Sequence, residues 1–210
     1  MGSNACLSKG VCAMSLVTLV SGGLDSTLMA IMAREEGLTQ FPLFIDYGQI
    51  CRNQEWNACL TVHSRFGLPR PVMMNLRGFG QLIPSGLTKR GMRINEDAFL
   101  PGRNLLFLLA GCAYAYKTKS NAVAIGLLSE ESHLFTDQTS EFVKSTEALI
   151  DLAMGCDIRI ITPLMSFTKH DVLEMAKKKG IDGTYSCHAG TIPPCGVCVS
   201  CQEAKRAQIG

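Results

Sequence analysis

Residues 16–27 read LVTLVSGGLDST, an apolar run that ends at two glycines, followed by an acid and two hydroxyl residues. A buried strand accounts for the apolar run, and the stretch from residue 25 onward, DSTLMAIMAREEG, has the pattern of a helix. The adjacent glycines permit positive φ and let the backbone approach a ligand without a Cβ in the way. Hydroxyls and bare N–H groups at a helix start form an anion site, usually for phosphate. The stretch therefore predicts a strand, a phosphate-binding turn and a helix, although a simply capped strand–helix connection would read similarly.

The same alternation of apolar runs and helical patterns continues along the chain. Strands are predicted at 16–20, 41–46, 71–75, 122–127 and 158–161, and helices at 25–36, 53–66, 104–117, 138–153 and 168–179. Continuously apolar strands with helices between them are typical of a parallel sheet covered on both faces. We therefore expect an α/β fold, a doubly wound parallel sheet of about five strands. The long loop-like stretch 76–103 is expected to be functional or a lid.

Composition narrows the class of function. The chain has 210 residues, 47% of them hydrophobic, and a net charge of +2, which is ordinary for a soluble globular protein. No block of Lys and Arg exceeds the KKK at 177–179, so a small-molecule partner is expected and nucleic acid is not. Apolar stretches such as 105–111 are too short to span a membrane, and the N-terminal residues lack the apolar core of a signal peptide. We expect a cytoplasmic protein without membrane contact.

Polar residues gather where three predicted strands end. SGGLDST closes the first strand, DYGQ at 46–49 closes the second, and GLLSEES at 126–132 closes the fourth. The carboxyl ends of parallel strands share one edge of the sheet, and ligands bind there at the switch in strand order. The three clusters together predict a pocket at that edge.

The phosphate loop lacks the Lys of a Walker A motif and the spaced glycines of a dinucleotide fingerprint, which disfavours kinase and hydride chemistry. SGGLDST resembles the pyrophosphate loop of the N-type ATP pyrophosphatases, the PP-loop superfamily, which cleave ATP between the α and β phosphates. The segments 45–49 (IDYGQ), 100–115, 162–172 and 185–201 are similar, in order, to segments of the QueC family of 7-cyano-7-deazaguanine synthases. The resemblance spans about residues 16–206.

Membership of that family would imply an adenine nucleotide alpha hydrolase-like fold and an ATP-dependent ligase of queuosine biosynthesis. Such an enzyme converts 7-carboxy-7-deazaguanine and ammonia to 7-cyano-7-deazaguanine through an adenylated acid and an adenylated amide. The resemblance also implies ATP with Mg²⁺ as a substrate, and a homodimer.

The resemblance assigns roles to individual residues. The residues expected to hold ATP are Val20, Ser21, Gly22, Gly23, Leu24, Asp25, Ser26, Thr27, Asp46, Tyr47 and Gly126. Asp25 would hold Mg²⁺ or order the loop, while Arg103 and Lys169 would neutralise phosphate charge in the transition state. The plainer roles are a helix cap for Asp25, a turn residue for Asp46, and solvated surface charges for Arg103 and Lys169.

One segment departs from the family pattern. Glu130 and Asp137 match acids of the family and are expected to bind the substrate, but Gln138 and Thr139 stand where the family carries Cys-Arg. The missing Arg leaves two alternatives open: a relative that transfers the activated acid to another amine, such as a protein amine, or a PP-loop enzyme that acts on tRNA. Lys144 is a candidate replacement for the lost cation. The intact SGGLDST disfavours a third alternative, a binding module with a vestigial loop.

Four of the ten cysteines crowd near the C-terminus with the spacing C-x7-C-x2-C-x2-C: Cys187, Cys195, Cys198 and Cys201. Two-residue spacings let thiolates converge on one tetrahedral ion, and four sulfur ligands without an open position indicate structural zinc. An iron–sulfur cluster is the main competitor, and zinc also matches the family's pattern. His188 could substitute as a ligand. The other six cysteines are expected to be small buried hydrophobes.

The domain boundaries follow from these motifs. Residues 1–13 are an N-terminal extension that need not be native, and 14–183 are expected to form the ATP pyrophosphatase α/β domain. Residues 184–210 are expected to form a C-terminal zinc-binding knuckle.

Overall fold

The computed structural model describes residues 14–129 and 135–209. Residues 1–13, and with them the predicted extension, lie outside this description, as does Glu130. Five parallel strands form one sheet in the order β3-β2-β1-β4-β5, which confirms the predicted fold class. The strands are β1 (Ser15–Leu19), β2 (Thr39–Asp46), β3 (Val72–Asn75), β4 (Ala122–Ala124) and β5 (Arg159–Ile161).

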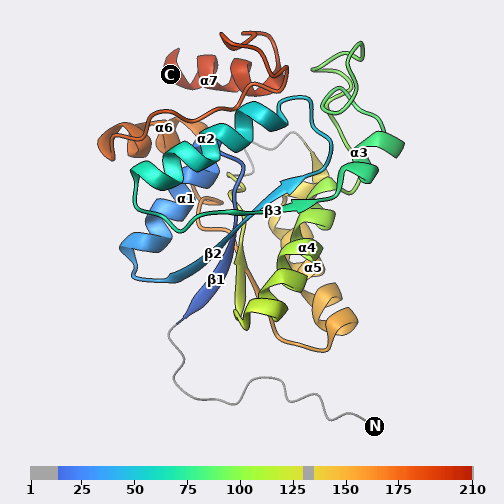
Figure 1. Cartoon of the computed structure of the whole chain (residues 1–210), viewed down its shortest axis with the longest axis vertical. Helices are drawn as coiled ribbons and strands as arrows, with labels where there is room; N and C mark the ends of the chain where they lie inside the picture. Colours follow the sequence, from blue (N-terminus) through green and yellow to red (C-terminus); the bar gives the residue numbers. More distant parts are fainter. Residues whose placement is uncertain (1–13, 130–134, 210) are drawn as a thin grey trace.

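Helices cover both faces of the sheet (Figure 1). They are α1 (Leu24–Glu35), α2 (Arg52–Arg65), α3 (Arg77–Leu82), α4 (Arg103–Thr118), α5 (Ser140–Met154), α6 (Lys169–Lys178) and α7 (Val199–Ile209), with a 3-10 turn at Thr136–Gln138. Successive side chains of a strand point to opposite faces, so Val17 and Leu19 pack with α4 and α5, whereas Leu16 packs with α1 and α6. A core on each face fixes the register of β1, and therefore the position of the loop that follows it.

Several elements differ from the sequence prediction. β4 ends at Ala124 rather than at residue 127, and the predicted loop 76–103 contains the short helix α3. Helix α5 begins at Ser140 because the Thr139 hydroxyl accepts a hydrogen bond from the Phe142 N–H at 3.1 Å. The predicted start of α6 is confirmed: the Thr168 hydroxyl accepts from the Asp171 N–H at 3.2 Å, and the Asp171 carboxylate accepts from the Thr168 N–H at 2.8 Å.

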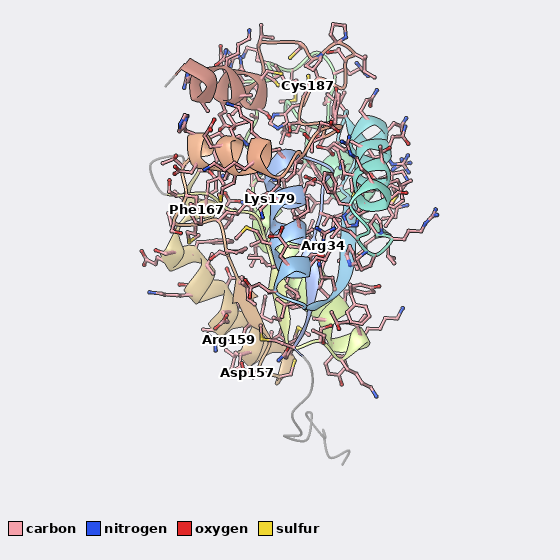
Figure 2. All side chains as sticks on the ribbon, turned by 90° about the vertical axis from the view of Figure 1, so that its left-hand side faces the viewer. Arg34, Asp157, Arg159, Phe167, Lys179 and Cys187 are labelled. Atoms are coloured by element: carbon pink, nitrogen blue, oxygen red, sulfur yellow. The ribbon has the colours of Figure 1, made fainter. Side chains whose placement is uncertain are left out.

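The C-terminal segment lies across the carboxyl edge of the sheet. Cys187 is at the opposite end of the molecule from Asp157 and Arg159, which mark the edge where β5 begins (Figure 2). Helix α7 packs on α6, where His170 Nδ1 contacts the Ala207 carbonyl oxygen at 3.0 Å. Within the described residues no helix has both the length and the apolar character needed to cross a membrane.

Candidate active site and metal centre

The loop between β1 and α1 is built around a glycine that no other residue can replace without displacing α2. Gly22 has φ +78°, and a Cβ there would lie 2.4 Å from the Glu55 carbonyl oxygen and 2.6 Å from the Cys59 nitrogen. Its carbonyl oxygen accepts a hydrogen bond from the Tyr185 N–H at 2.9 Å, which ties the C-terminal segment to the loop. The loop is therefore clamped between α2 and the segment that carries the cysteines.

Two hydroxyls order the inside of the loop. The Ser26 hydroxyl accepts from the Ser21 N–H at 3.2 Å and donates to the Gly23 carbonyl oxygen at 3.2 Å. The Ser21 and Ser26 hydroxyl oxygens are 3.1 Å apart, and the Gly23 N–H donates to Ser21 Oγ at 3.3 Å. The predicted hydroxyls therefore order the loop at the start of α1, where the partial positive charge of a helix N-terminus favours an anion.

Asp25 and Lys169 meet across the mouth of this loop. The Lys169 ammonium lies 2.6 and 2.9 Å from the two carboxylate oxygens of Asp25, although the residues are 144 positions apart. Asp25 lies in the first turn of α1 and Lys169 is the first residue of α6, so two helix N-termini converge here. Gly126 completes the rim: a Cβ on it would lie 3.4 Å from the Ser26 nitrogen. The sequence prediction named all four of these residues.

A cavity of about 300 Å³ opens beside the pair at the carboxyl edge of β1, β2 and β4. Ten of the residues that were predicted to be functional line it: Val20, Ser21, Gly23, Leu24, Asp25, Ser26, Tyr47, Arg103, Gly126 and Lys169. Gly22 and Thr27 lie behind the loop, outside the lining. The arrangement brings a phosphate-type loop, two cations and a carboxylate onto one cavity.

Arg103 starts α4 and reaches the cavity from the face of the sheet opposite to α1. Its guanidinium carbon is 6.0 Å from the centroid of the Phe107 ring, and its buried Nε has no hydrogen-bond partner among the described residues. Burial raises the pKa of the neighbouring Tyr47 hydroxyl, and Arg103 opposes that shift. Within the described residues Arg103 forms no ion pair, so its charge is available to a ligand.

The cavity lining also includes Glu55, His188 and Glu203, to which the sequence analysis gave no role in binding ATP or the acid. Burial, with a smaller contribution from Arg103, lowers the pKa of His188 to about 4. Burial also raises the pKa of Glu203, and the nearby Lys169 opposes this shift. His188 belongs to the family-like segment 185–201, whereas Glu55 and Glu203 lie outside every quoted segment and reach the cavity from α2 and α7.

Two predicted residues have structural partners and lie outside the cavity. The Asp46 carboxylate accepts hydrogen bonds from Arg52 Nε at 2.9 Å and from Arg77 Nε at 2.7 Å, and the residue is 1% exposed. Asp137 presents its backbone oxygen to the Asn104 side-chain amide at 2.9 Å. We do not retain either carboxylate in the candidate site, because the first is neutralised by arginines and neither faces the cavity.

The residues that replace the family's Cys-Arg have separate roles. Gln138 lines the cavity, and its side-chain oxygen accepts a hydrogen bond from the Phe135 N–H at 3.0 Å. Thr139 caps α5 and does not line the cavity. The lost Arg is therefore not replaced by Thr139, and Lys144 does not line the cavity either.

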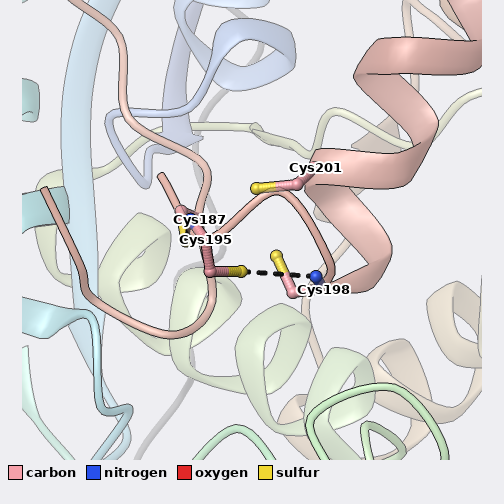
Figure 3. A group of neighbouring side chains, drawn as sticks. All are labelled: Cys187, Cys195, Cys198 and Cys201. Atoms are coloured by element: carbon pink, nitrogen blue, oxygen red, sulfur yellow. Dashed lines mark hydrogen bonds between the residues drawn. The ribbon is translucent and has the colours of Figure 1, made fainter. Parts of the chain in front are cut away.

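The four clustered cysteines converge on one point (Figure 3). Their Sγ atoms all lie within 4.8 Å of one another, and a tetrahedral zinc site with bonds of about 2.3 Å requires separations of about 3.8 Å. The Cys195 N–H donates to Cys187 Sγ at 3.2 Å and the Cys198 N–H donates to Cys195 Sγ at 3.3 Å, a pattern that stabilises thiolates. The residues present therefore fit a four-coordinate thiophilic metal.

The remaining described cysteines agree with their predicted role. Cys51, Cys59, Cys112 and Cys156 are buried thiols. Burial raises the pKa of the Cys59 and Cys112 thiols to about 12, which keeps both in the unreactive protonated form. The other two predicted members, Cys6 and Cys12, lie outside the described residues.

Solved structures with a similar fold include U34-tRNA thiolase NcsA from Methanococcus maripaludis, at a TM-score of 0.54 and 15% identity, covering 94% of this chain and 65% of that one. NMN synthetase from Francisella tularensis matches with a TM-score of 0.53 and 15% identity, over 82% of this chain and 63% of that one. These likenesses support the predicted PP-loop-type fold.

Proteins related in sequence identify the family more closely than the structural likenesses do. A 7-cyano-7-deazaguanine synthase from Campylobacter concisus is 31% identical over 93% of this chain and 91% of the relative. One from Methanothermobacter thermautotrophicus is 28% identical over 92% and 94%. The family model described as "Queuosine biosynthesis protein QueC" matches residues 15–209. The chain therefore belongs to the QueC family of queuosine biosynthesis proteins and is an ATP-using enzyme.

Proposed function

We propose that this chain is an ATP-dependent carbon–nitrogen ligase that converts 7-carboxy-7-deazaguanine and ammonia to 7-cyano-7-deazaguanine. The names of its curated relatives support this reaction, and they give no support to transfer onto another amine or onto tRNA. The observation that carries the proposal is the Asp25–Lys169 contact beside the SGGLDST loop, in the same cavity as Arg103.

Activation of the acid requires ATP phosphates and a carboxylate to come close together. A carboxylate oxygen attacks the α-phosphorus of ATP, pyrophosphate leaves, and an acyl-adenylate forms. The Ser21 and Ser26 hydroxyls and the loop N–H groups are suited to hold the departing pyrophosphate, because fixed donors stabilise charge without reorganisation. Lys169 would neutralise phosphate charge, while Asp25 holds the ammonium in place.

The later steps need no further side-chain nucleophile. Ammonia attacks the acyl carbon and releases AMP, which gives the amide. A second ATP then adenylates the amide oxygen with loss of pyrophosphate, and elimination of AMP and a proton leaves the nitrile. One cavity can serve both adenylations, because each places an oxygen of the same substituent against the α-phosphorus.

Metals would contribute at two places. Mg²⁺ bound to ATP would offset phosphate charge, and Asp25 and Glu203 are the cavity carboxylates near Lys169 that suit its preference for oxygen ligands. Zn²⁺ is the metal we propose for Cys187, Cys195, Cys198 and Cys201, because four cysteine ligands leave no open position for catalysis.

The test is product analysis by mass spectrometry, with purified protein, ATP, Mg²⁺ and 7-carboxy-7-deazaguanine, with and without ammonium. We expect nitrile and AMP only with ammonium. A stalled adenylate or amide, or AMP without nitrile, would assign the activated acid to another acceptor, and no AMP at all would refute the proposal.

A pair of lysine variants of α6 sharpens the test. Lys169→Met should lower nitrile formation by a factor of 100 or more, because a transition-state charge contact is worth roughly 3–4 kcal/mol. Lys178→Met, at the exposed end of the same helix, is the matched control and should retain full activity. Equal rates for the two variants would remove Lys169 from the chemistry.

A further inference from the structure

Besides the phosphate-type loop and the Asp25–Lys169 pair, the cavity lining holds a second group of polar side chains, which includes the Arg103 that the sequence had assigned to phosphate. Glu55 from α2, Arg103 from α4 and His188 from the C-terminal segment line it together with the rings of Tyr47 and Phe107. The two rings have centroids 5.3 Å apart. Aromatic walls beside charged groups are suited to a flat, polar heterocycle.

Glu55 is held in position by Gln49. The Gln49 side-chain N–H groups donate to Glu55 Oε2 at 3.0 Å and to the Ile45 carbonyl oxygen at 3.3 Å, while its side-chain oxygen accepts from the Tyr47 N–H at 3.0 Å. The C-terminal end of β2 thus holds the side-chain amide of Gln49, and this amide holds one carboxylate oxygen of Glu55. Among the described residues no cation forms an ion pair with Glu55.

Two nitrogen atoms of residues that line the cavity with Glu55 lack hydrogen-bond partners within the described ranges. Arg103 Nε and His188 Nδ1 are buried and have no hydrogen-bond partner in the described part of the chain. Burial raises the pKa of Glu55, and hydrogen bonds with Gln49 and Cys51, together with the charge of Arg103, only partly oppose that shift. Buried polar atoms are nearly always paired in folded proteins, so two unpaired nitrogens beside a buried carboxylate indicate that a ligand supplies the missing partners.

We propose that Glu55 and Arg103 form the subsite that recognises the base of the acid substrate. A guanine-type ring presents two N–H donors, from the ring and from the 2-amino group, beside a carbonyl acceptor. A carboxylate next to a guanidinium matches that edge, with Glu55 accepting and Arg103 donating. Adenine presents a ring nitrogen acceptor beside its amino group, which the carboxylate would repel, so the subsite belongs to the acid rather than to ATP.

This inference rests on the proposed function, since it concerns the substrate of the same cavity. It is tested with Glu55→Gln, which keeps the shape of the side chain but turns an N–H toward an N–H of the base. Calorimetric titration without turnover should show the Kd for 7-carboxy-7-deazaguanine rising roughly 10- to 100-fold, the value of a charge-assisted hydrogen bond. The Kd for ATP should stay within about twofold, and the exposed Glu36→Gln is the matched control.

A second arm compares two ligands, and its first measurement uses wild-type protein alone. An analogue of the acid that lacks the 2-amino group should bind wild-type protein roughly tenfold more weakly than the acid does, whereas Glu55→Gln should no longer discriminate between the two. Unchanged affinity of Glu55→Gln for the acid, a loss confined to ATP, or an equal loss for both ligands would each overturn the inference. If wild-type protein forms nitrile in any of these cases, the proposed function stands and only the subsite fails.

Discussion

Replacing Gly22 by alanine should disturb both stability and ATP binding, for reasons that can be separated. An alanine at φ +78° costs about 1–2 kcal/mol for the left-handed conformation. The new Cβ would also lie 2.4 Å from the Glu55 carbonyl oxygen and 2.6 Å from the Cys59 nitrogen, which are backbone atoms and cannot rotate away. Helix α2 would have to shift by roughly 1 Å, and overpacking of that kind costs about 1–3 kcal/mol.

Gly37→Ala is the matched control, because Gly37 has φ +72° but no atom within 4 Å of the position that a Cβ would take. Urea unfolding should show Gly22→Ala losing about 2–5 kcal/mol and Gly37→Ala losing only the conformational part, about 1–2 kcal/mol. ATP affinity should fall more than tenfold in the first variant and stay unchanged in the second. Equal losses of stability in the two variants would refute the close approach of α2 to the loop.

Three further outcomes are expected. Asp46→Asn should lower the free energy of unfolding by about 2 kcal/mol, because it removes the negative charge that Arg52 and Arg77 share. Thermal melting of the variant beside wild type measures this loss. An unchanged melting temperature would contradict a stabilising ion pair between Asp46 and the two arginines. Treatment with a chelator should lower the melting temperature sharply, since a metal held by the four cysteines would contribute folding free energy on the order of 10 kcal/mol. A treated protein that melts unchanged would exclude a structural metal. Burial lowers the pKa of His63 below 6.5, so the unfolded chain binds the proton before the folded chain does, and the free energy of unfolding should fall as pH drops below about 6.5. His63→Gln should flatten that part of the stability–pH curve. An identical slope in the variant would show that another group titrates there.

The fold was predictable because its signals are local. Each strand is an apolar run bounded by polar residues, and each of the long helices on the two faces has its own pattern, so five strands and five helices could be assigned from spacing alone. Helix α7 escaped prediction because its sequence, VSCQEAKRAQI, follows the cysteine cluster and has no apolar stripe. Its position depends on packing against α6, which is a contact between distant parts of the chain.

The candidate site was predictable only where a motif carries it. The loop residues and Lys169 occur in recognisable segments, and the structure brings Asp25 and Lys169 into contact. Asp46 shows the limit: a strand-end acid has the same sequence signature whether it faces a ligand or, as here, two arginines from α2 and α3. Glu55 and His188 give the opposite case, because their functional interest comes from their place in the cavity beside nitrogens without partners, and only the folded structure can reveal that.

The segment that carries the cysteine cluster also contacts the candidate active site directly. The Tyr185 N–H donates to the Gly22 carbonyl oxygen at 2.9 Å, and His188 and Glu203, which flank the cluster, line the same cavity as Lys169. A metal that fixes Cys187 and Cys201 therefore also fixes one wall of that cavity. Losing it should release the wall together with α7, so a metal with no part in the chemistry would still be required for activity.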